Sequence, residues 1–304
     1  MSSIDSQLLF DEAVTLSSVK VHTDSDKIFQ DKNRLETSDG TCRAQDVRLA
    51  NAYVNFAYVP RPPWSPAYSS ELLLADGLKC GGDAVTVFEV FEGAIADRLR
   101  ESIVSAISRN DGPAISENRA IIFAGIGRKL TYEGDVSFHG FTIDTPNLTT
   151  VSIDPTANAF VGIHVDSWGQ KPLSARSSCP VRVCLNLGPE DRFLLFSCWT
   201  VGAIAGAVAN LPARPVEANV NSLLAMFLAR HPWLPIVKLR IRPGEAYIAP
   251  VENLPHDGCS LEQRMGAMHT AFRGNFAPLP AVVQKIGQPD CGPQARSWLA
   301  GRES

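Results

Sequence analysis

Large apolar residues in the first third of the chain change from irregular to helical spacing. Before residue 83, the polar segments 23–32 and 36–43 predict loops. Residues 58–66 contain four prolines and predict a connector, because proline lacks a backbone donor and is not tolerated inside a helix. Apolar residues then recur every fourth position from Phe91 to Ile107, which predicts an amphipathic helix over 88–109 that packs on a sheet.

From Arg119 onward, short runs of β-branched and aromatic residues alternate with Gly, Pro and Asn. Such runs predict strands, and two further helices are expected over 202–209 and 220–229. Many short strands separated by turn residues indicate a sandwich or a barrel. The predicted strands cover residues 120–124, 135–143, 148–153, 160–166, 181–187, 192–199, 236–241, 245–249 and 268–276.

Composition and charge narrow the class of protein. The chain has 304 residues, of which 45% are hydrophobic and 20% are charged, as is typical of a globular protein with a substantial core. The net charge is −4 and no cluster of Lys and Arg is present, so nucleic-acid binding is not indicated. The first residues do not resemble a secretory signal, and the longest apolar stretch, around 201–208, is too short to span a bilayer. Seven scattered cysteines without a Cys-x-x-Cys pair predict free thiols, and a cytoplasmic protein is expected.

The most informative motif lies in residues 160–168, Phe-Val-Gly-Ile-His-Val-Asp-Ser-Trp. His164 and Asp166 are two positions apart in a predicted strand, so their side chains should emerge on the same face. His256 follows another predicted strand and a turn bounded by proline. Two histidines and one carboxylate can occupy one face of an octahedral metal and leave the opposite face open, as in non-haem Fe(II) oxygenases. The alternative is a chance His-x-Asp with a structural histidine.

Residues 158–276 resemble the Fe(II)- and 2-oxoglutarate-dependent oxygenases. The resemblance rests on His164-x-Asp166, on the sequence Arg-Pro-Gly-Glu-Ala-Tyr-Ile-Ala-Pro at 242–250, and on His256 followed by basic residues. It implies a mainly β fold with flanking helices around a double-stranded β-helix core of the jelly-roll, cupin-like type. It also implies three regions: an N-terminal supporting region over 1–82, an oxygenase domain over 83–280, and a C-terminal tail over 281–304 that wraps on the surface.

The same resemblance implies a definite chemistry. His164, Asp166 and His256 would hold Fe(II), with no further catalytic side chain required. 2-Oxoglutarate and dioxygen would take the open positions, and a small molecule, such as an amino acid or a natural-product intermediate, would be hydroxylated. Halogenating members lack the ligand carboxylate, so the presence of Asp166 favours hydroxylation. A guanidinium suits the far carboxylate of 2-oxoglutarate. Arg273, in the last predicted strand, is the first candidate, and Arg264, nearer to His256, is the second.

Two other classes of function stay open. One is a cupin-like, metal-dependent isomerase or hydrolase, and the other is a non-catalytic binding module. Iron-dependent release of succinate separates the oxygenase from the first, and stoichiometric metal binding separates both from an accidental motif. The chain contains neither a P-loop, nor a dinucleotide-binding fingerprint, nor a Gly-x-Ser-x-Gly motif.

Overall fold

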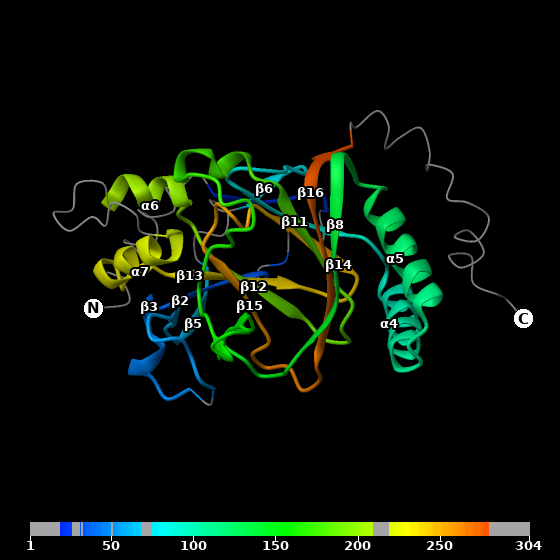
Figure 1. Cartoon of the computed structure of the whole chain (residues 1–304), viewed down its shortest axis with the longest axis horizontal. Helices are drawn as coiled ribbons and strands as arrows, with labels where there is room; N and C mark the ends of the chain where they lie inside the picture. The colour runs from blue at the N-terminus through cyan, green and yellow to red at the C-terminus, as the bar shows by residue number, and fades with distance from the viewer. Residues whose placement is uncertain are drawn as a thin grey trace, which may run out of the picture.

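Two β-sheets that face each other form the centre of the molecule (Figure 1). The computed structural model describes residues 19–25, 31, 33–49, 51–67, 74–208 and 219–279. The larger sheet has seven strands in the order β6-β1-β7-β14-β11-β16-β8. Its strands are β1 (Lys20–Thr23), β6 (Leu74–Asp76), β7 (Ala84–Glu89), β8 (Leu130–Asp144), β11 (Val181–Asn186), β14 (Glu245–Ala249) and β16 (Ala267–Pro278).

The smaller sheet has five strands in the order β15-β12-β13-β2-β5, all antiparallel. In the larger sheet, β1 is parallel to β6 and β7, and the remaining pairs are antiparallel. The strands of the smaller sheet are β2 (Leu35–Ser38), β5 (Trp64–Pro66), β12 (Arg192–Ser197), β13 (Ile236–Ile241) and β15 (His256–Cys259). Two short pairs complete the strands: β3 (Thr41–Arg43) with β4 (Tyr58–Pro60), and β9 (Ile153–Asp154) with β10 (Ala159–Phe160).

Helices cover the outer face of each sheet (Figure 1). Those beside the larger sheet are α4 (Gly93–Ser108) and α5 (Gly112–Ile126). Those beside the smaller sheet are α6 (Val201–Val208) and α7 (Val220–Arg230). The 3-10 helices are η1 (Ala44–Asp46) and η2 (Leu173–Ser178). None of the described helices combines the length and the apolar character that a membrane crossing needs.

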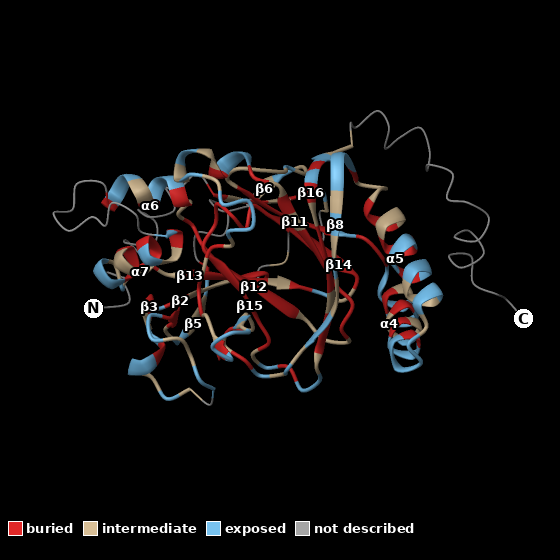
Figure 2. Ribbon diagram, viewed as in Figure 1, coloured by how far each residue is buried: buried red, intermediate tan, exposed pale blue. Residues whose placement is uncertain are grey.

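Strand alternation divides the buried residues into three layers (Figure 2). In β11, Val183 and Leu185 pack toward α4 and α5, whereas Cys184 between them faces the space between the sheets. In β12, Leu195 packs toward α7, whereas Leu194 faces the same inner space. These two strands therefore present one set of side chains to a helical layer and the other set to the interior between the sheets.

The sequence correctly predicts a mainly β protein with flanking helices, but the predicted strand over 120–124 is wrong. These residues belong to α5, which begins where the Asp111 side chain accepts a hydrogen bond from the backbone of Ala114 at 3.1 Å. A short apolar run buried on several sides has the same pattern in a helix as in a strand. The helix predicted over 88–109 also begins later, because β7 continues to Glu89. Its last apolar residue, Ile107, is 45% exposed, since a four-residue repeat drifts around a helix of 3.6 residues per turn.

The N-terminal third is more regular than its polar composition predicts. The segment 36–43, expected as a loop, contains parts of β2 and β3, and the expected connector 58–66 contains β4 and β5. Prolines are tolerated in β5 because it is an edge strand of the smaller sheet. The region 1–82 thus contributes strands to both sheets. The tail expected over 281–304 lies outside the described residues.

Candidate metal centre

The structure brings His164, Asp166 and His256 together between the two sheets. One ligand atom from each residue lies within 4.8 Å of the other two. His164 and His256 form an isolated antiparallel bridge, with backbone N–H···O distances of 3.1 and 2.8 Å, and their ring centroids are 4.8 Å apart. The backbone N–H of Asp166 donates to Val251 at 3.0 Å. The same-face prediction for His164 and Asp166 is therefore confirmed, although most of the expected strand over 160–166 is irregular.

The segment that carries His164 and Asp166 has β15 on one side and, among the described residues, no strand on the other, where a side chain takes the place of a strand. Asn221, in the first turn of α7, accepts from the backbone N–H of Val165 at 2.8 Å and donates to its carbonyl at 3.1 Å. Val165 lies between His164 and Asp166, so the Asn221 amide fixes the backbone from which both side chains project. The pair of hydrogen bonds has the donor and acceptor pattern of a sheet ladder.

Replacement of Asn221 by Leu should lower the affinity of this candidate centre for a divalent metal ion by about 10-fold, because outer residues that orient metal ligands commonly contribute 10- to 100-fold. The apolar side chain leaves the polar backbone atoms of Val165 without partners. Anaerobic calorimetry would measure the affinity, and thermal unfolding would measure the accompanying loss of stability. Ser222→Ala is the matched control on the same turn, and equal effects from the two variants would contradict the assigned role.

Two further groups hold the loop that follows Asp166. Buried Arg176 in η2 donates through Nη1 to the carbonyl oxygens of Asp166 and Glu252, at 3.0 and 2.9 Å, and through Nη2 to Ser167 Oγ at 2.7 Å. Glu252 in turn accepts from the backbone of Gly169 at 2.9 Å. The orientation of the Asp166 carboxylate is therefore supported from both ends of its loop.

The hydrogen bonds of the two histidines direct the same ring nitrogen toward Asp166. Nδ1 of His164 is 2.9 Å from the carbonyl of Gly162, and Nδ1 of His256 is 3.0 Å from that of Leu254. A carbonyl can only accept, so Nδ1 carries the proton and Nε2 of the neutral ring keeps its lone pair. The Nε2 atoms lie 3.4 Å (His164) and 3.8 Å (His256) from the Asp166 carboxylate oxygens.

Two buried atoms at this centre have no hydrogen-bond partner within the described residues: His256 Nε2 and Asp166 Oδ2. Asp166 Oδ2 does lie 3.3 Å from Arg182 Nη2 in an ion pair, but burying His256 Nε2 without a partner costs free energy, and a metal ion would satisfy both atoms. Neutral imidazole nitrogens and a carboxylate suit first-row divalent metals, including Fe(II). The residues present therefore fit a metal site with three protein ligands on one side.

The charge states of His256 and Asp166 at neutral pH suit metal binding. Burial lowers the pKa of His256 to about 3, so its ring is neutral. Burial opposes ionisation of Asp166, but the His164 hydrogen bond and the nearby charges outweigh it and hold the pKa of Asp166 well below its usual range. For His164, burial favours the neutral ring, but Asp166 and Asp257 raise its pKa overall. A metal ion bound at this centre would displace the second proton of the His164 ring, which the two carboxylates favour.

A cavity of about 270 Å³ extends from His256 into the space between the sheets. Arg192 of β12 lies in its wall, buried, with Nη2 and Nε 3.0 and 3.3 Å from Asp144 Oδ2 and Nη1 3.6 Å from Cys184 Sγ. Gly258 gives this guanidinium its space, because a Cβ there would lie 2.8 Å from Arg192 Nη2. With its histidines neutral, the wall carries two guanidinium groups, those of Arg182 and Arg192, and one carboxylate.

The two arginines selected from the sequence lie elsewhere. Arg264 is exposed in the connection between β15 and β16, where its backbone N–H donates to Glu190 at 2.8 Å, and it is not among the residues that line the cavity. Arg273 lies beside Trp168, with Nη2 2.5 Å from Glu252 Oε1. The sequence gives no sign of Arg192, because an arginine at the start of an apolar run is equally typical of a solvated strand end.

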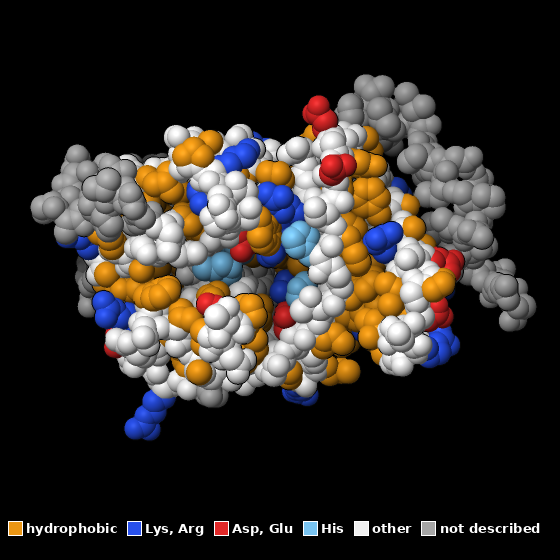
Figure 3. Space-filling model, viewed as in Figure 1, with side chains coloured by type: hydrophobic (Ala, Val, Ile, Leu, Met, Phe, Trp, Pro, Cys, Tyr) orange, Lys and Arg blue, Asp and Glu red, His pale blue; other side chains and the backbone are white. Residues whose placement is uncertain are grey.

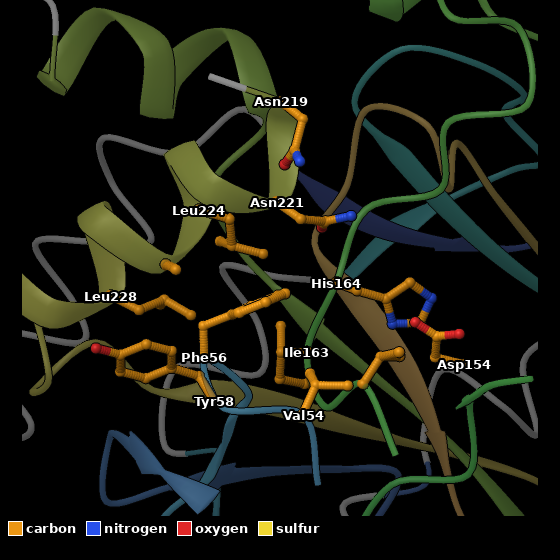
Figure 4. Close-up of a pocket in the computed structure, with 12 residues that line it drawn as sticks. Val54, Phe56, Tyr58, Asp154, Ile163, His164, Asn219, Asn221, Leu224 and Leu228 are labelled. Atoms are coloured by element: carbon orange, nitrogen blue, oxygen red, sulfur yellow. The ribbon is translucent and has the colours of Figure 1, made fainter. Parts of the chain in front are cut away.

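A second cavity, of about 200 Å³, lies beside the segment that carries His164. Figure 4 shows Leu224 and Leu228 of α7 on one side of Ile163, and His164 with Asp154 on the other. Its walls are mainly apolar. This cavity borders the centre, and none of its described lining residues other than His164 belongs to the close three-residue group.

Comparison of the chain with protein-family models gives no match, and comparison with curated proteins gives none either. The assignment of a function therefore rests on the residues and geometry of this centre.

Proposed function

We propose that the protein is an Fe(II)- and 2-oxoglutarate-dependent oxygenase that hydroxylates a small molecule. The observation that carries the proposal is the convergence of His164, Asp166 and His256, in which the buried Nε2 atom of His256 has no hydrogen-bond partner among the described residues. Three ligands on one side of a metal leave the other side for a chelating cosubstrate and for dioxygen. When bound, iron and 2-oxoglutarate supply the oxidising chemistry, with release of succinate and carbon dioxide.

The strand order supports a jelly-roll core, which we propose as the finer description of the fold. From β8 to β16, successive strands of the two sheets belong alternately to the larger and the smaller sheet, with the His164 segment counted beside β15. Only β12 and β13 follow each other in the same sheet. This is the path of a strand pair wound into a double helix. It places His164 and His256 on neighbouring strands at one end of the interior.

The cavity supports 2-oxoglutarate as the cosubstrate. Its wall has one more guanidinium than carboxylate, and a divalent metal held by one carboxylate would add further positive charge. A dianion is the ligand that neutralises this charge. His256 and Gly258 point to the same side of β15, so Arg192 beside Gly258 lies one strand repeat deeper than the metal ligand. The protein's own part is to hold the anion between these points and to exclude water.

The purified protein should release succinate only when Fe(II), 2-oxoglutarate and dioxygen are all present. Such uncoupled turnover is slow, and addition of the substrate should accelerate it. Chromatographic measurement of succinate, with metal-free protein and the Asp166→Ala variant as controls, provides the test. Reaction without oxygen, or metal binding without succinate release, would instead favour a cupin-like isomerase or hydrolase.

A further inference from the structure

Three side chains that can carry positive charge surround Trp168, two residues beyond Asp166. The guanidinium carbons of Arg182 and Arg273 lie 4.6 and 5.3 Å from the centre of the indole ring, and the His139 ring lies 5.1 Å from it. Trp168 is 42% exposed, whereas the two arginine side chains are 22% and 19% exposed. We call Trp168, Arg182, Arg273 and His139 the mouth cluster. Figure 3 shows that histidine, basic and acidic side chains gather near the middle of the face in view.

The larger sheet positions this cluster. Arg182 in β11 pairs directly with Arg273 in β16, and Ser137 in β8 pairs with Arg273 on the other side. Two like charges directly opposite each other on one sheet face are unfavourable. Burial and the neighbouring guanidinium groups also lower the pKa of His139, so this ring is neutral at neutral pH.

The partners of the two arginines leave most of their donors unused. Arg182 contacts Asp166 Oδ2 through Nη2 at 3.3 Å, and Arg273 donates to Glu252 through Nη2. A guanidinium has five N–H donors, and among the described residues no other hydrogen bond is formed by either group. If Asp166 ligates a metal, as proposed above, its charge is shared with that metal and Arg182 is less compensated.

We propose that the mouth cluster binds the carboxylate of the substrate, which is therefore an anionic small molecule. Paired guanidinium groups present donors in the planar fork that a carboxylate matches. The Trp168 indole holds both forks in place and offers an apolar face to the rest of the ligand. Arg182 contacts Asp166. A substrate whose carboxylate binds to Arg182 therefore has its neighbouring carbon atoms next to the candidate metal centre. The inference rests on the proposed function only in treating the ligand as a substrate.

Calorimetry on metal-free, full-length protein tests the carboxylate site without relying on turnover. The probes are free amino acids, N-acetyl amino acids and simple aliphatic and aromatic carboxylic acids, each with its primary amide. We expect at least one acid to bind, with its amide at least 10-fold weaker. Arg182→Gln and Arg273→Gln should each lower the affinity for the acid by 10-fold or more. Arg109→Gln, which replaces an exposed arginine at the end of α4, should not change this affinity. The acid that binds should then accelerate succinate release in the iron-loaded protein.

The variants guard against simple loss of structure. The amide introduced by Arg273→Gln would still offer a donor to buried Glu252, and Trp168→Ala removes the stack without changing any charge. The Trp168→Ala variant should weaken binding of the same acid while its far-ultraviolet circular dichroism matches the unmodified chain. Binding of no acid, equal affinity for acid and amide, or unchanged affinity in both arginine variants would overturn the proposal. Arginine-dependent acid binding in a protein that releases no succinate would overturn the oxygenase function and leave the carboxylate site standing.

Discussion

Replacement of Asp166 by alanine should abolish stoichiometric Fe(II) binding and leave the fold intact. The carboxylate is the only anionic member of the three-residue centre, and its Oδ2 atom is buried without a hydrogen bond among the described residues. Loss of an outer residue typically costs 10- to 100-fold in metal affinity, so loss of a direct ligand should cost more than ~100-fold. Anaerobic calorimetry with Fe(II), and metal analysis after gel filtration, would measure this loss.

Matched variants distinguish the metal site from a structural cluster. The variants His164→Ala and His256→Ala should lose Fe(II) binding as Asp166→Ala does. His231 lies at the end of α7, so the control variant His231→Ala should still bind one equivalent of Fe(II). Asp166→Asn keeps the shape and removes the charge, so it should also lose iron without lowering the unfolding temperature substantially. Full iron occupancy in all three alanine variants would refute the site.

The juxtaposition of the three candidate ligands could be predicted because its signal is local. His164 and Asp166 need only the two-residue period of an extended chain to share a face, and that period holds even where the segment is irregular. His256 could be added because a turn bounded by proline precedes it. The hydrogen bonds from Asn221 and Arg176 could not be predicted, since they join segments that only the tertiary fold brings together.

The errors in secondary structure have a similar origin. In the apolar run 120–124, Ile121 and Ile122 are buried in α5 against the larger sheet and Phe123 packs beside them, and a run this short does not show which period separates a helix from a strand. The polar sequence of β2 does not predict a strand, because its neighbours lie far along the chain: β13 is near the other end, and β3, η1 and β4 separate β2 from β5. In both cases long-range pairing, and not local propensity, decides the structure.

Arg192, and not Arg273 or Arg264, is the residue whose loss should most weaken 2-oxoglutarate binding. Arg192 is buried in the wall of the cavity one strand repeat beyond His256, whereas Arg273 is not among the residues that line the cavity and Arg264 is exposed. Removal of one partner of a buried charge pair costs about 2–5 kcal/mol. That cost corresponds to a rise of about 30-fold or more in the dissociation constant.

The measurement is an anaerobic titration of the iron-loaded variants with 2-oxoglutarate, followed by the metal-to-ligand charge-transfer band. Arg192→Gln should show the 30-fold rise with iron still bound, and Arg264→Gln should match the unmodified protein. Because Arg192 also neutralises Asp144, the variant Asp144→Asn is the essential control. It disturbs the same ion pair but keeps the guanidinium, so the affinity of this variant for 2-oxoglutarate should be retained or increased. A loss of affinity in Asp144→Asn equal to that in Arg192→Gln would mean that the ion pair only supports the wall. A loss of affinity confined to Arg273→Gln would mean that Arg273 anchors 2-oxoglutarate. The carboxylate bound by the mouth cluster would then belong to 2-oxoglutarate and not to the substrate.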